Sequence, residues 1–455
     1  MTPAPATEWG STDPTGAHIP NQEETTNPRR SPIPGNKTPK VVILGQGYVG
    51  LPVAMRAVEV GYDVVGLDVD KKRVDDLVAG RSYVGDVSDD RLAAMARTGR
   101  FLPTTNYDSA SGFDFAVITV PTPLHESLPD LSFVEDAARD LAPLLTAGAT
   151  VILESTTYPG TTQELLVPIL ERHSRLRAGE DFFVGYSPER IDPGNPTYGF
   201  VETPKVVSGI NQPSLERVQL FYDTLVRRTV PVSSPREAEL TKLLENTFRH
   251  VNIALVNELA VFAHQLGIDI WESIEAASTK PFGYMRFTPG PGVGGHCLPV
   301  DPSYLSWQVR RQLGQSFRFI ELANDINDHM PHHVVQRVVR MLNDRSRSVK
   351  GSRILLVGLA YKRNTGDIRE APSLKLIDLL QEMGAIVAGV DPYVEPHLWP
   401  SGVEPRPLTA DTLASSDLAI LVTDHDSFDF SLLSDSPTLI FDTRNRLPAD
   451  RAQVL

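Results

Sequence analysis

The chain has 455 residues, of which 41% are hydrophobic and 22% are charged, and its formal net charge is −14. This length and ordinary composition predict a globular protein of two or three domains. The acidic balance argues against nucleic acid or an anionic membrane as the main partner, but it does not exclude a local basic pocket for a phosphorylated ligand.

Residues 1–37 are rich in Pro, Thr, Ser and Asn and are expected to form a disordered tail. They lack the apolar core of a signal peptide, and no run of about 18 apolar residues predicts a membrane span. The chain has one cysteine, so it cannot form an internal disulfide and nothing points to an oxidising compartment. We therefore expect a cytoplasmic protein.

Short β-branched runs alternate with helical patterns after the tail. The segment VVILG at 41–45 predicts a buried strand, because it is short, rich in β-branched residues and closed by glycine. A helix is expected at 51–61. Further strands are expected at 63–70, 113–120, 150–155 and 181–187. Since strands that alternate with helices indicate a parallel, doubly wound sheet, residues 38–212 are predicted to form a Rossmann-like domain.

The pattern changes after residue 212. Residues 236–267 contain no Pro or Gly before the last position and carry apolar residues at helical spacing, which predicts one helix roughly 45 Å long. Helical patterning resumes near 303–345, so residues 213–330 are predicted to form a central helical domain. The long helix is either a dimerisation or interdomain spine or an ordinary core helix, and we expect a homodimer or a higher homo-oligomer.

A second α/β pattern begins at SRILLVGLAYK, residues 352–362. Further strands are expected at 386–392, 417–425 and 438–444. Residues 331–455 are therefore predicted to form a second Rossmann-like domain. The fold class is α/β, with two doubly wound parallel-sheet domains joined by a long central helix and a helical dimerisation region.

The motif GQGYVG at 45–50 predicts a dinucleotide-binding turn between the first strand and its helix. Gly45 allows the tight turn, Gly47 lets the backbone approach a pyrophosphate, and Gly50 permits close packing of helix and strand. The cofactor-binding residues expected here are Gly45, Gly47, Tyr48, Val49, Gly50 and Asp68.

Asp68 ends the second strand, where its carboxylate is placed to bind a ribose 2′-hydroxyl and to repel a 2′-phosphate. It therefore favours NAD over NADP, although the basic run at 71–73 weakens this discrimination. The corresponding stretch of the second half, 358–367, lacks the glycine motif and is not expected to bind a dinucleotide in the same way. Its basic residues Lys362, Arg363 and Arg369 remain available for phosphate.

The only cysteine, Cys297, lies in GPGVGGHCLPVDPSY at 290–304. A free cysteine is most often buried filler, but these surroundings are polar and rich in glycine. Pro299 indicates that a helix starts nearby, and a helix N-terminus lowers the pKa of a thiol. Asp301, four residues on, shares a helical face with the cysteine, an arrangement that suits a covalent step followed by activation of water. Catalytic and structural roles both remain open at this point.

The long helix contributes a second set of polar residues. Lys242, Asn246 and Arg249 are spaced to share one helical face. If this face borders a cleft, Lys242 would act as a base or bind an oxyanion beside Asn246; otherwise it is an ordinary exposed lysine. Glu189 follows a strand, where α/β sites collect, or is a solvated loop carboxylate.

Seven motifs in this order resemble the UDP-glucose/GDP-mannose dehydrogenase family over roughly residues 38–450. The motifs are GQGYVGLP, VPTP, STTYPGTT, SPERIDPGN, TKLLENTFR, GPGVGGHCLPVDP and GLAYKRNTGDIRE. The resemblance implies a four-electron oxidation of a sugar C6 alcohol to a carboxylate with two NAD. It implies a UDP-sugar substrate, NAD as the cofactor and no metal.

The resemblance also implies roles for residues. Cys297 would capture the aldehyde as a thiohemiacetal, which the second hydride transfer converts to a thioester. Lys242 and Asn246 would polarise or deprotonate the C6 oxygen and stabilise the oxyanion, and Asp301 would help to activate Lys242 or the hydrolytic water. Glu189 would be a general acid/base. Thr122 would position water and contact the cofactor, and Arg369 is the remaining cofactor-binding residue.

Departures from the glucose-specific members bear on the sugar. Those members typically read GGSCFPKD, whereas this chain has His296 and Val300 at the Ser and Lys positions. After Glu189 they carry a Phe-Leu pair and a second Glu, where this chain has Arg190, Ile191 and Pro193. The pattern resembles members that oxidise UDP-N-acetylhexosamines, UDP-GlcNAc in particular. The substrate-binding residues expected are Glu189, Arg190, Lys242, Asn246, Arg249, Gly294, His296, Tyr361 and Lys362.

Within the family the C-terminal half closes over UDP, which implies UDP-binding roles for Tyr361, Lys362 and Arg369. Arg444 is expected to reach the active site or the cofactor. The alternative for each of these residues is an ion pair at the surface.

Rival substrates are UDP-ManNAc, UDP-glucose and GDP-mannose. Two other functions remain to be weighed. A two-electron hydroxyacid dehydrogenase needs neither Cys297 nor a second α/β half, and a silent NAD- and UDP-sugar-binding module does not need Lys242.

Overall fold

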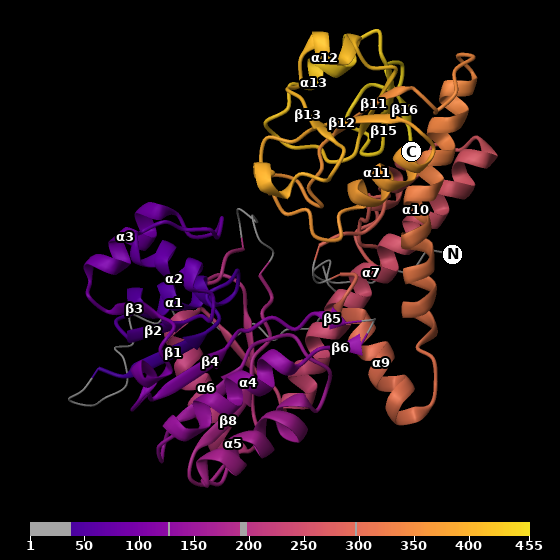
Figure 1. Ribbon diagram of the computed structural model, residues 1–455. Helices are drawn as coiled ribbons and strands as arrows, with labels where there is room; N and C mark the ends of the chain where they lie inside the picture. The colour runs from indigo at the N-terminus through magenta and orange to yellow at the C-terminus, as the bar shows by residue number, and fades with distance from the viewer. Residues whose placement is uncertain (1–37, 126–127, 192–197, 296–297) are drawn as a thin grey trace, which may run out of the picture. The chain divides into compact units, whose positions relative to one another are not determined.

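The computed structural model describes residues 38–125, 128–191, 198–295 and 298–455 (Figure 1). The chain forms two compact units. The N-terminal unit contains the described residues of 29–251 and 294–322, and the C-terminal unit contains 252–293 and 323–455. Within the described parts, no helix combines the length and the hydrophobicity of a membrane span.

An eight-stranded sheet in the order β10-β9-β8-β7-β4-β1-β2-β3 forms the framework of the N-terminal unit. Its strands are β1 Lys40–Leu44, β2 Asp63–Leu67, β3 Phe101–Thr104, β4 Phe115–Ile118, β7 Thr150–Leu153, β8 Phe183–Tyr186, β9 Lys205–Gly209 and β10 Thr229–Pro231. From β3 to β8 all neighbours are parallel, and the central order is doubly wound. The predicted Rossmann-like fold is therefore confirmed.

The last two strands of this sheet differ from the prediction. β9 pairs antiparallel with β8, and β10 pairs parallel with β9. No helix lies among the described residues between β8 and β9, and a parallel pair needs such a crossover. The sheet also extends past the expected boundary at residue 212, because β10 belongs to it.

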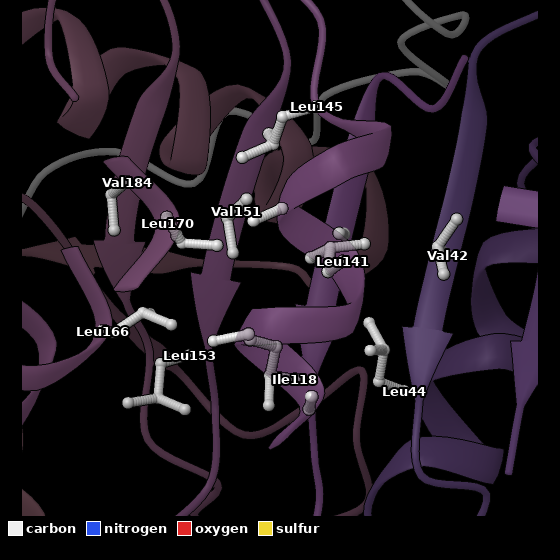
Figure 2. Close-up of a cluster of buried hydrophobic side chains, with 14 of the residues drawn as sticks. Val42, Leu44, Ile118, Leu141, Leu145, Val151, Leu153, Leu166, Leu170 and Val184 are labelled. Carbon is white, nitrogen blue, oxygen red and sulfur yellow. The ribbon is translucent and has the colours of Figure 1, made fainter. Parts of the chain in front are cut away.

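Helices cover both faces of this sheet. They are α1 Gly50–Glu59, α2 Lys71–Val78, α3 Asp89–Arg97, α4 Ser132–Leu141, α5 Val167–Ser174 and α6 Gln212–Leu225. Short helical turns lie at Tyr107–Ala110, Ala142–Leu144 and Thr162–Leu166. A separate small hairpin consists of β5 Leu124–His125 and β6 Leu128–Pro129. Alternate strand residues face opposite layers, so Leu153 packs towards α4 and α5 (Figure 2), whereas its neighbour Ile152 packs in the layer of α1 and α6.

The predicted long helix is confirmed as α7, Pro235–Leu266. Its residues up to Val251 belong to the N-terminal unit and those from Asn252 to the C-terminal unit. The helical stretch expected near 303–345 is two helices, α9 Asp301–Leu313 and α10 Arg318–Asn343. Gly314 ends α9 in the left-handed conformation, with φ 65°, which glycine adopts without steric cost.

The C-terminal unit contains a parallel six-stranded sheet in the order β13-β12-β11-β14-β15-β16. Its strands are β11 Arg353–Val357, β12 Ile386–Val390, β13 Glu404–Pro405, β14 Leu418–Leu421, β15 Leu439–Asp442 and β16 Gln453–Val454. Its helices are α8 Ile270–Ser278, α11 Pro372–Glu382, α12 Ala410–Ala414 and α13 Phe430–Ser434, with a turn at Pro396–Leu398. Two apolar layers again flank the sheet, as a doubly wound domain requires.

Replacement of Leu153 by Ala should lower the free energy of unfolding by about 2–5 kcal/mol, because the fully buried side chain leaves a cavity between β7 and α5. Chemical denaturation followed by circular dichroism measures this loss. Leu102→Ala on β3 is the matched control, since Leu102 is 51% exposed, and it should change the stability by about 0.5 kcal/mol or less. Equal losses in both variants would contradict the described core.

Candidate active site

The turn between β1 and α1 admits only glycine at two positions. Gly45 has φ +91°, and a Cβ added there would lie 2.8 Å from the carbonyl oxygen of Thr119. A Cβ at Gly50 would lie 1.8 Å from the carbonyl oxygen of Gly45. A Cβ at Gly47 meets no protein atom within 4 Å. Gly47 is therefore the position at which an outside molecule can approach the backbone, as the sequence predicts for a pyrophosphate.

Asp68 follows β2 and organises this turn with its carboxylate. One oxygen accepts a hydrogen bond from the amide of Gln46 at 2.8 Å, and the other accepts one from the amide of Asp70 at 2.9 Å. Arg73 lies 3.4 Å from the same carboxylate, so the basic run does place a cation beside it. The remaining lone pairs fit a ribose hydroxyl, and the glycine turn fits the pyrophosphate of NAD. Tyr48 is exposed at the start of α1, and Val49 precedes its first residue.

The N-terminal unit brings together Asn246 from α7 and Asp301 from the first turn of α9. The amide nitrogen of Asn246 donates a hydrogen bond of 2.5 Å to the Asp301 carboxylate, and both residues are buried. Lys242 lies one helical turn before Asn246 and is also buried. Its positive charge acts on the carboxylate of Glu189. The alternative of an ordinary exposed lysine is wrong.

Glu189 lies just beyond β8 and is fixed by three donors. Its Oε1 accepts hydrogen bonds of 2.6 Å from the amides of Arg190 and Ile191, and its Oε2 lies 3.2 Å from the ammonium of Lys205. Burial opposes ionisation, but the charge of Lys205, the hydrogen bonds with Glu154 and with the Ile191 amide, and the charge of Lys242 hold the pKa of Glu189 below its usual value. The alternative of a solvated loop carboxylate is wrong.

The sequence prediction missed the other members of this network. Lys205 also pairs with Glu154, which follows β7, and the hydroxyl of Tyr222 on α6 donates to Glu154 at 2.6 Å. An acid at the end of a predicted strand is a signal that the sequence contains for Glu154. Lys205 gives no such signal, because only the antiparallel direction of β9 brings its first residue to the edge where β7 and β8 end.

Glu239 on α7 is a further residue that the sequence prediction missed. Its carboxylate accepts hydrogen bonds from the amide of Gly160 at 2.5 Å and from the amide and hydroxyl of Thr162 at 2.9 and 2.7 Å. Burial raises the pKa of Glu239 to about 7, although these hydrogen bonds oppose the shift. The helix that carries Lys242 is thereby joined to the STTYPGTT segment.

The other residues predicted from the sequence fall in different surroundings. Thr122 is buried, and its carbonyl accepts a hydrogen bond from Tyr304 on α9. Arg190 pairs with Glu245 at 2.7 Å and donates to the carbonyl of Pro204. Arg249 is exposed and Gly294 is half-buried. Cys297, His296 and Pro193 lie outside the described residues.

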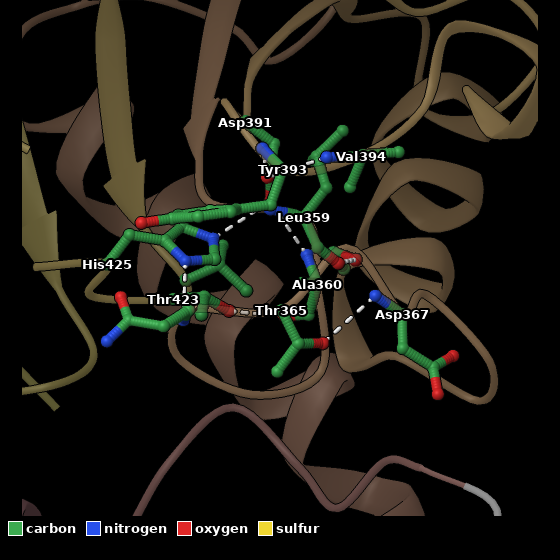
Figure 3. A network of polar contacts seen from close by, with 12 residues as sticks. Leu359, Ala360, Thr365, Asp367, Asp391, Tyr393, Val394, Thr423 and His425 are labelled. Atoms are coloured by element: carbon green, nitrogen blue, oxygen red, sulfur yellow. Dashed lines mark hydrogen bonds and ion pairs between the residues drawn. The ribbon is translucent and has the colours of Figure 1, made fainter. Parts of the chain in front are cut away.

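The second sheet has a similar turn after its first strand, but the aspartate beside this turn makes different contacts (Figure 3). Gly358, at φ +84°, follows β11 as Gly45 follows β1. Asp391 follows β12 and accepts hydrogen bonds from four amides, of Leu359, Ala360, Tyr393 and Val394. His425 also contacts this carboxylate at 3.0 Å. Both oxygens of Asp391 are therefore used within the protein, and the prediction that this turn does not bind a dinucleotide as the first turn does stays a prediction.

The basic residues near this turn are engaged by carboxylates. Arg369 is exposed and forms a bidentate pair with Asp367 at 2.5–3.0 Å, and Arg363 pairs with Asp424. Tyr361 and Lys362 are half-buried in the same loop. Arg444 follows β15 and lies against Gly290, where an added Cβ would be 2.9 Å from its guanidinium. The structure thus places Gly290, the first residue of the glycine-rich stretch, beside Arg444 within the C-terminal unit.

Three consecutive parts of the chain match the domains of one family. Residues 39–226 match the NAD binding domain of the UDP-glucose/GDP-mannose dehydrogenase family, residues 236–329 its central domain and residues 355–449 its UDP binding domain. These matches account for the glycine turn in the first sheet and for the altered turn in the second.

Relatives that are named as nucleotide-sugar dehydrogenases match over most of their length. The chain is 38% identical over 359 residues to a UDP-N-acetyl-D-glucosamine 6-dehydrogenase of Pseudomonas aeruginosa, covering 78% of this chain and 83% of the relative. It is 35% identical over 394 residues to a UDP-N-acetyl-D-mannosamine dehydrogenase of Pyrococcus horikoshii, covering 86% and 90%. The solved structure of the UDP-D-ManNAc dehydrogenase from Pyrococcus horikoshii has a TM-score of 0.82 at 33% identity, covering 91% of this chain and 98% of that chain.

The chain therefore belongs to the UDP-glucose/GDP-mannose dehydrogenase family and is an NAD-dependent oxidoreductase that acts on a nucleotide sugar.

Replacement of Gly47 by Val should weaken NAD binding at least about tenfold while leaving the melting temperature unchanged, because the new side chain meets no protein atom but blocks the approach of the pyrophosphate. Isothermal titration calorimetry and thermal melting measure the two effects. Gly50→Val is the contrasting variant and should destabilise the fold itself. Wild-type affinity in Gly47→Val would show that the cofactor does not approach this turn.

Proposed function

We propose that the chain oxidises the C6 hydroxyl of a UDP-N-acetylhexosamine, UDP-GlcNAc in particular, to the uronic acid with two NAD and water. The observation that carries this proposal is the buried set of Lys242, Asn246 and Asp301 in the same unit as the NAD turn. A buried ammonium beside an amide suits a reaction in which negative charge develops on an oxygen.

Each of the two oxidation steps needs a bound NAD as the hydride acceptor. Lys242 deprotonates or polarises the C6 hydroxyl, and Asn246 donates a hydrogen bond to the same oxygen while Asp301 orients the Asn246 amide. Cys297, which lies outside the described residues, provides the thiolate that holds the aldehyde as a thiohemiacetal. After the second oxidation the product is a thioester, and Glu189 assists its hydrolysis.

The assignment of the sugar rests on the residues around the site. His296 and Val300 replace the Ser and Lys typical of glucose-specific members, and Arg190 follows Glu189. The guanidinium of Arg190 is held by Glu245, the residue before Asn246. UDP-ManNAc is the second candidate, because a relative that covers most of the chain and a solved structure of the same fold are named for that sugar.

Binding of the UDP moiety is assigned to the C-terminal domain, in the loop that contains Tyr361 and Lys362. The match to a UDP binding domain supports this assignment. Arg369 and Arg363, in the same loop, are paired with the carboxylates of Asp367 and Asp424, so a diphosphate must compete with these ion pairs.

Purified protein should produce two NADH for each UDP-GlcNAc consumed, because the thioester route retains the aldehyde until the second oxidation. A panel of UDP-GlcNAc, UDP-ManNAc, UDP-glucose and GDP-mannose, followed by NADH absorbance, measures both the stoichiometry and the sugar. One NADH per substrate with release of aldehyde would exclude the thioester mechanism.

The variant Cys297→Ser serves as the control for this chemistry. It should lose steady-state turnover and retain NAD binding, since the alcohol cannot replace the thiolate. Normal turnover in this variant would show that the cysteine is structural.

The exposed apolar face of α7 supports a homodimer. Leucine and phenylalanine recur at helical spacing on the solvent side of the helix, which is the pattern of a helix packed against a partner. The exposed residues are Leu240, Leu244, Phe248, Leu255, Leu259, Phe262 and Leu266. A second copy of the chain is the occupant we propose, because the stripe continues along the helix in both units and few charges interrupt it.

The double variant Leu259→Glu/Phe262→Glu should shift the protein towards monomer, because burial of two carboxylates in an apolar interface is unfavourable. Size-exclusion chromatography with light scattering measures the mass. Gln265→Glu adds a carboxylate at an exposed polar position of the same helix and should leave the mass unchanged. A wild-type protein that is monomeric at all concentrations would contradict the proposed interface.

A further inference from the structure

A buried lysine lies between two carboxylates at the edge where β7 and β8 end. The ammonium of Lys205 contacts Glu154 and lies 3.2 Å from Glu189, and the side chains of Lys205 and Glu154 are 4% and 0% exposed. We propose that Lys205 is a positioning residue for the oxidation: it keeps the Glu189 carboxylate ionised and oriented as a base, and Glu154 anchors Lys205. This inference rests on the role of Glu189 in the proposed function.

The hydrogen bonds define the orientation of Glu189. Two backbone amides, of Arg190 and Ile191, bind Oε1, and Lys205 binds Oε2. Each of these groups donates a proton and none accepts one, so they favour the ionised form of the carboxylate. The same donors restrict rotation of the side chain. Glu189 is therefore prepared to accept a proton rather than to donate one.

Glu154 serves a different purpose. It is completely buried, its Oε2 accepts a hydrogen bond of 2.6 Å from Tyr222, and Lys205 stands 5.3 Å from the centre of the Tyr222 ring. Burial raises the pKa of Glu154 even though Lys205 opposes the shift. One ammonium cannot neutralise two carboxylates, so Glu189 ionises more readily than Glu154. Pairs of carboxylates whose environments separate their proton affinities divide acid and base roles in this way.

The charged groups that face Glu189 come from several elements. Lys205 belongs to β9 and Glu154 follows β7, while Lys242 on α7 adds a second positive charge. Arg190, the next residue in the chain, is neutralised by Glu245 on α7. Lys205 is thus the cation in direct contact with the carboxylate, and its loss should have the largest effect on the charge of Glu189.

The base would act in hydrolysis of the thioester. Glu189 accepts a proton from water as the water oxygen bonds to the acyl carbon, and the carbon–sulfur bond breaks with its electron pair passing to the sulfur of Cys297. The step consumes one water, releases the carboxylate product and needs no oxidant. Only the ionised form of Glu189 can perform it, so the rate must fall at pH values at which Glu189 is protonated.

Lys205→Met should move the acidic limb of the kcat–pH profile upwards by about one pH unit or more, because an opposite charge at this distance lowers a carboxyl pKa by about that amount. Below the limb, kcat should fall roughly tenfold per unit of this shift. Lys205→Arg restores the charge and should return the limb towards its wild-type position. An unchanged limb in Lys205→Met would overturn the proposal.

Glu154→Gln is the matched control from the same network. It removes a buried carboxylate and leaves Lys205 to Glu189, so its acidic limb should not move upwards. An upward shift equal to that of Lys205→Met would indicate a merely structural effect and would overturn the proposal. The double variant Glu154→Gln/Lys205→Met avoids an excess buried charge and provides a folded protein if Lys205→Met fails to fold; its limb should also move upwards.

Two further measurements separate this inference from the proposed function. Intact-mass spectrometry of Lys205→Met with UDP-GlcNAc and NAD, below the limb, should show a covalent adduct, since hydrolysis is slowed while both oxidations proceed. A loss of turnover without an adduct would count against the proposal. Glu189→Gln tests the role of Glu189 itself, and wild-type activity in that variant would refute this role. If Glu189→Gln loses activity but the acidic limb of Lys205→Met is not shifted, only the role of Lys205 is refuted.

Discussion

The buried carboxylate of Glu239 connects the long helix α7 to the first sheet domain, and the arrangement of the site depends on that connection. Glu239 lies one turn before Lys242 in this helix, and its carboxylate accepts three hydrogen bonds from Gly160 and Thr162. Because burial raises its pKa to about 7, the folded state holds this proton more tightly than the unfolded chain. The stability that the group contributes therefore declines as the pH rises from about 4.5 to about 7.

The two sheets have the same pair of residue types at their first crossover turn, but the contacts of the aspartate differ. In each, a glycine with positive φ follows the first strand and an aspartate follows the second. Asp68 binds two amides and keeps lone pairs for a ligand, whereas Asp391 binds four amides and His425 (Figure 3). His425 accepts a hydrogen bond from the amide of Asn364 at Nδ1, so its Nε2 carries the proton donated to Asp391. The aspartate of the second turn thereby fixes the amides of its own loop.

The polar residues described in the N-terminal unit form groups on different elements. The glycine turn and Asp68 lie at the ends of β1 and β2, and Glu154 and Glu189 lie at the ends of β7 and β8. The α7 residues Lys242 and Asn246 are held by a different set of contacts, through Asp301 and Glu239. In the described residues no cluster of His, Cys, Asp and Glu has the arrangement of a metal site.

Much of the protein was predictable from sequence, because local patterns report local structure. The alternation of strands and helices, the long helix and the glycine turn with Asp68 depend on short segments, and the motifs around Lys242 and Glu189 identify the family. The antiparallel course of β9 was not predictable, because pairing of distant strands leaves no local pattern. For the same reason Lys205, the partner of Glu189, was not predictable. The sequence by itself determined which residue types are available for the chemistry. Only the tertiary structure decided that Lys205, Glu154 and Glu239 are buried against them, since burial and charge pairing depend on segments far apart in the chain.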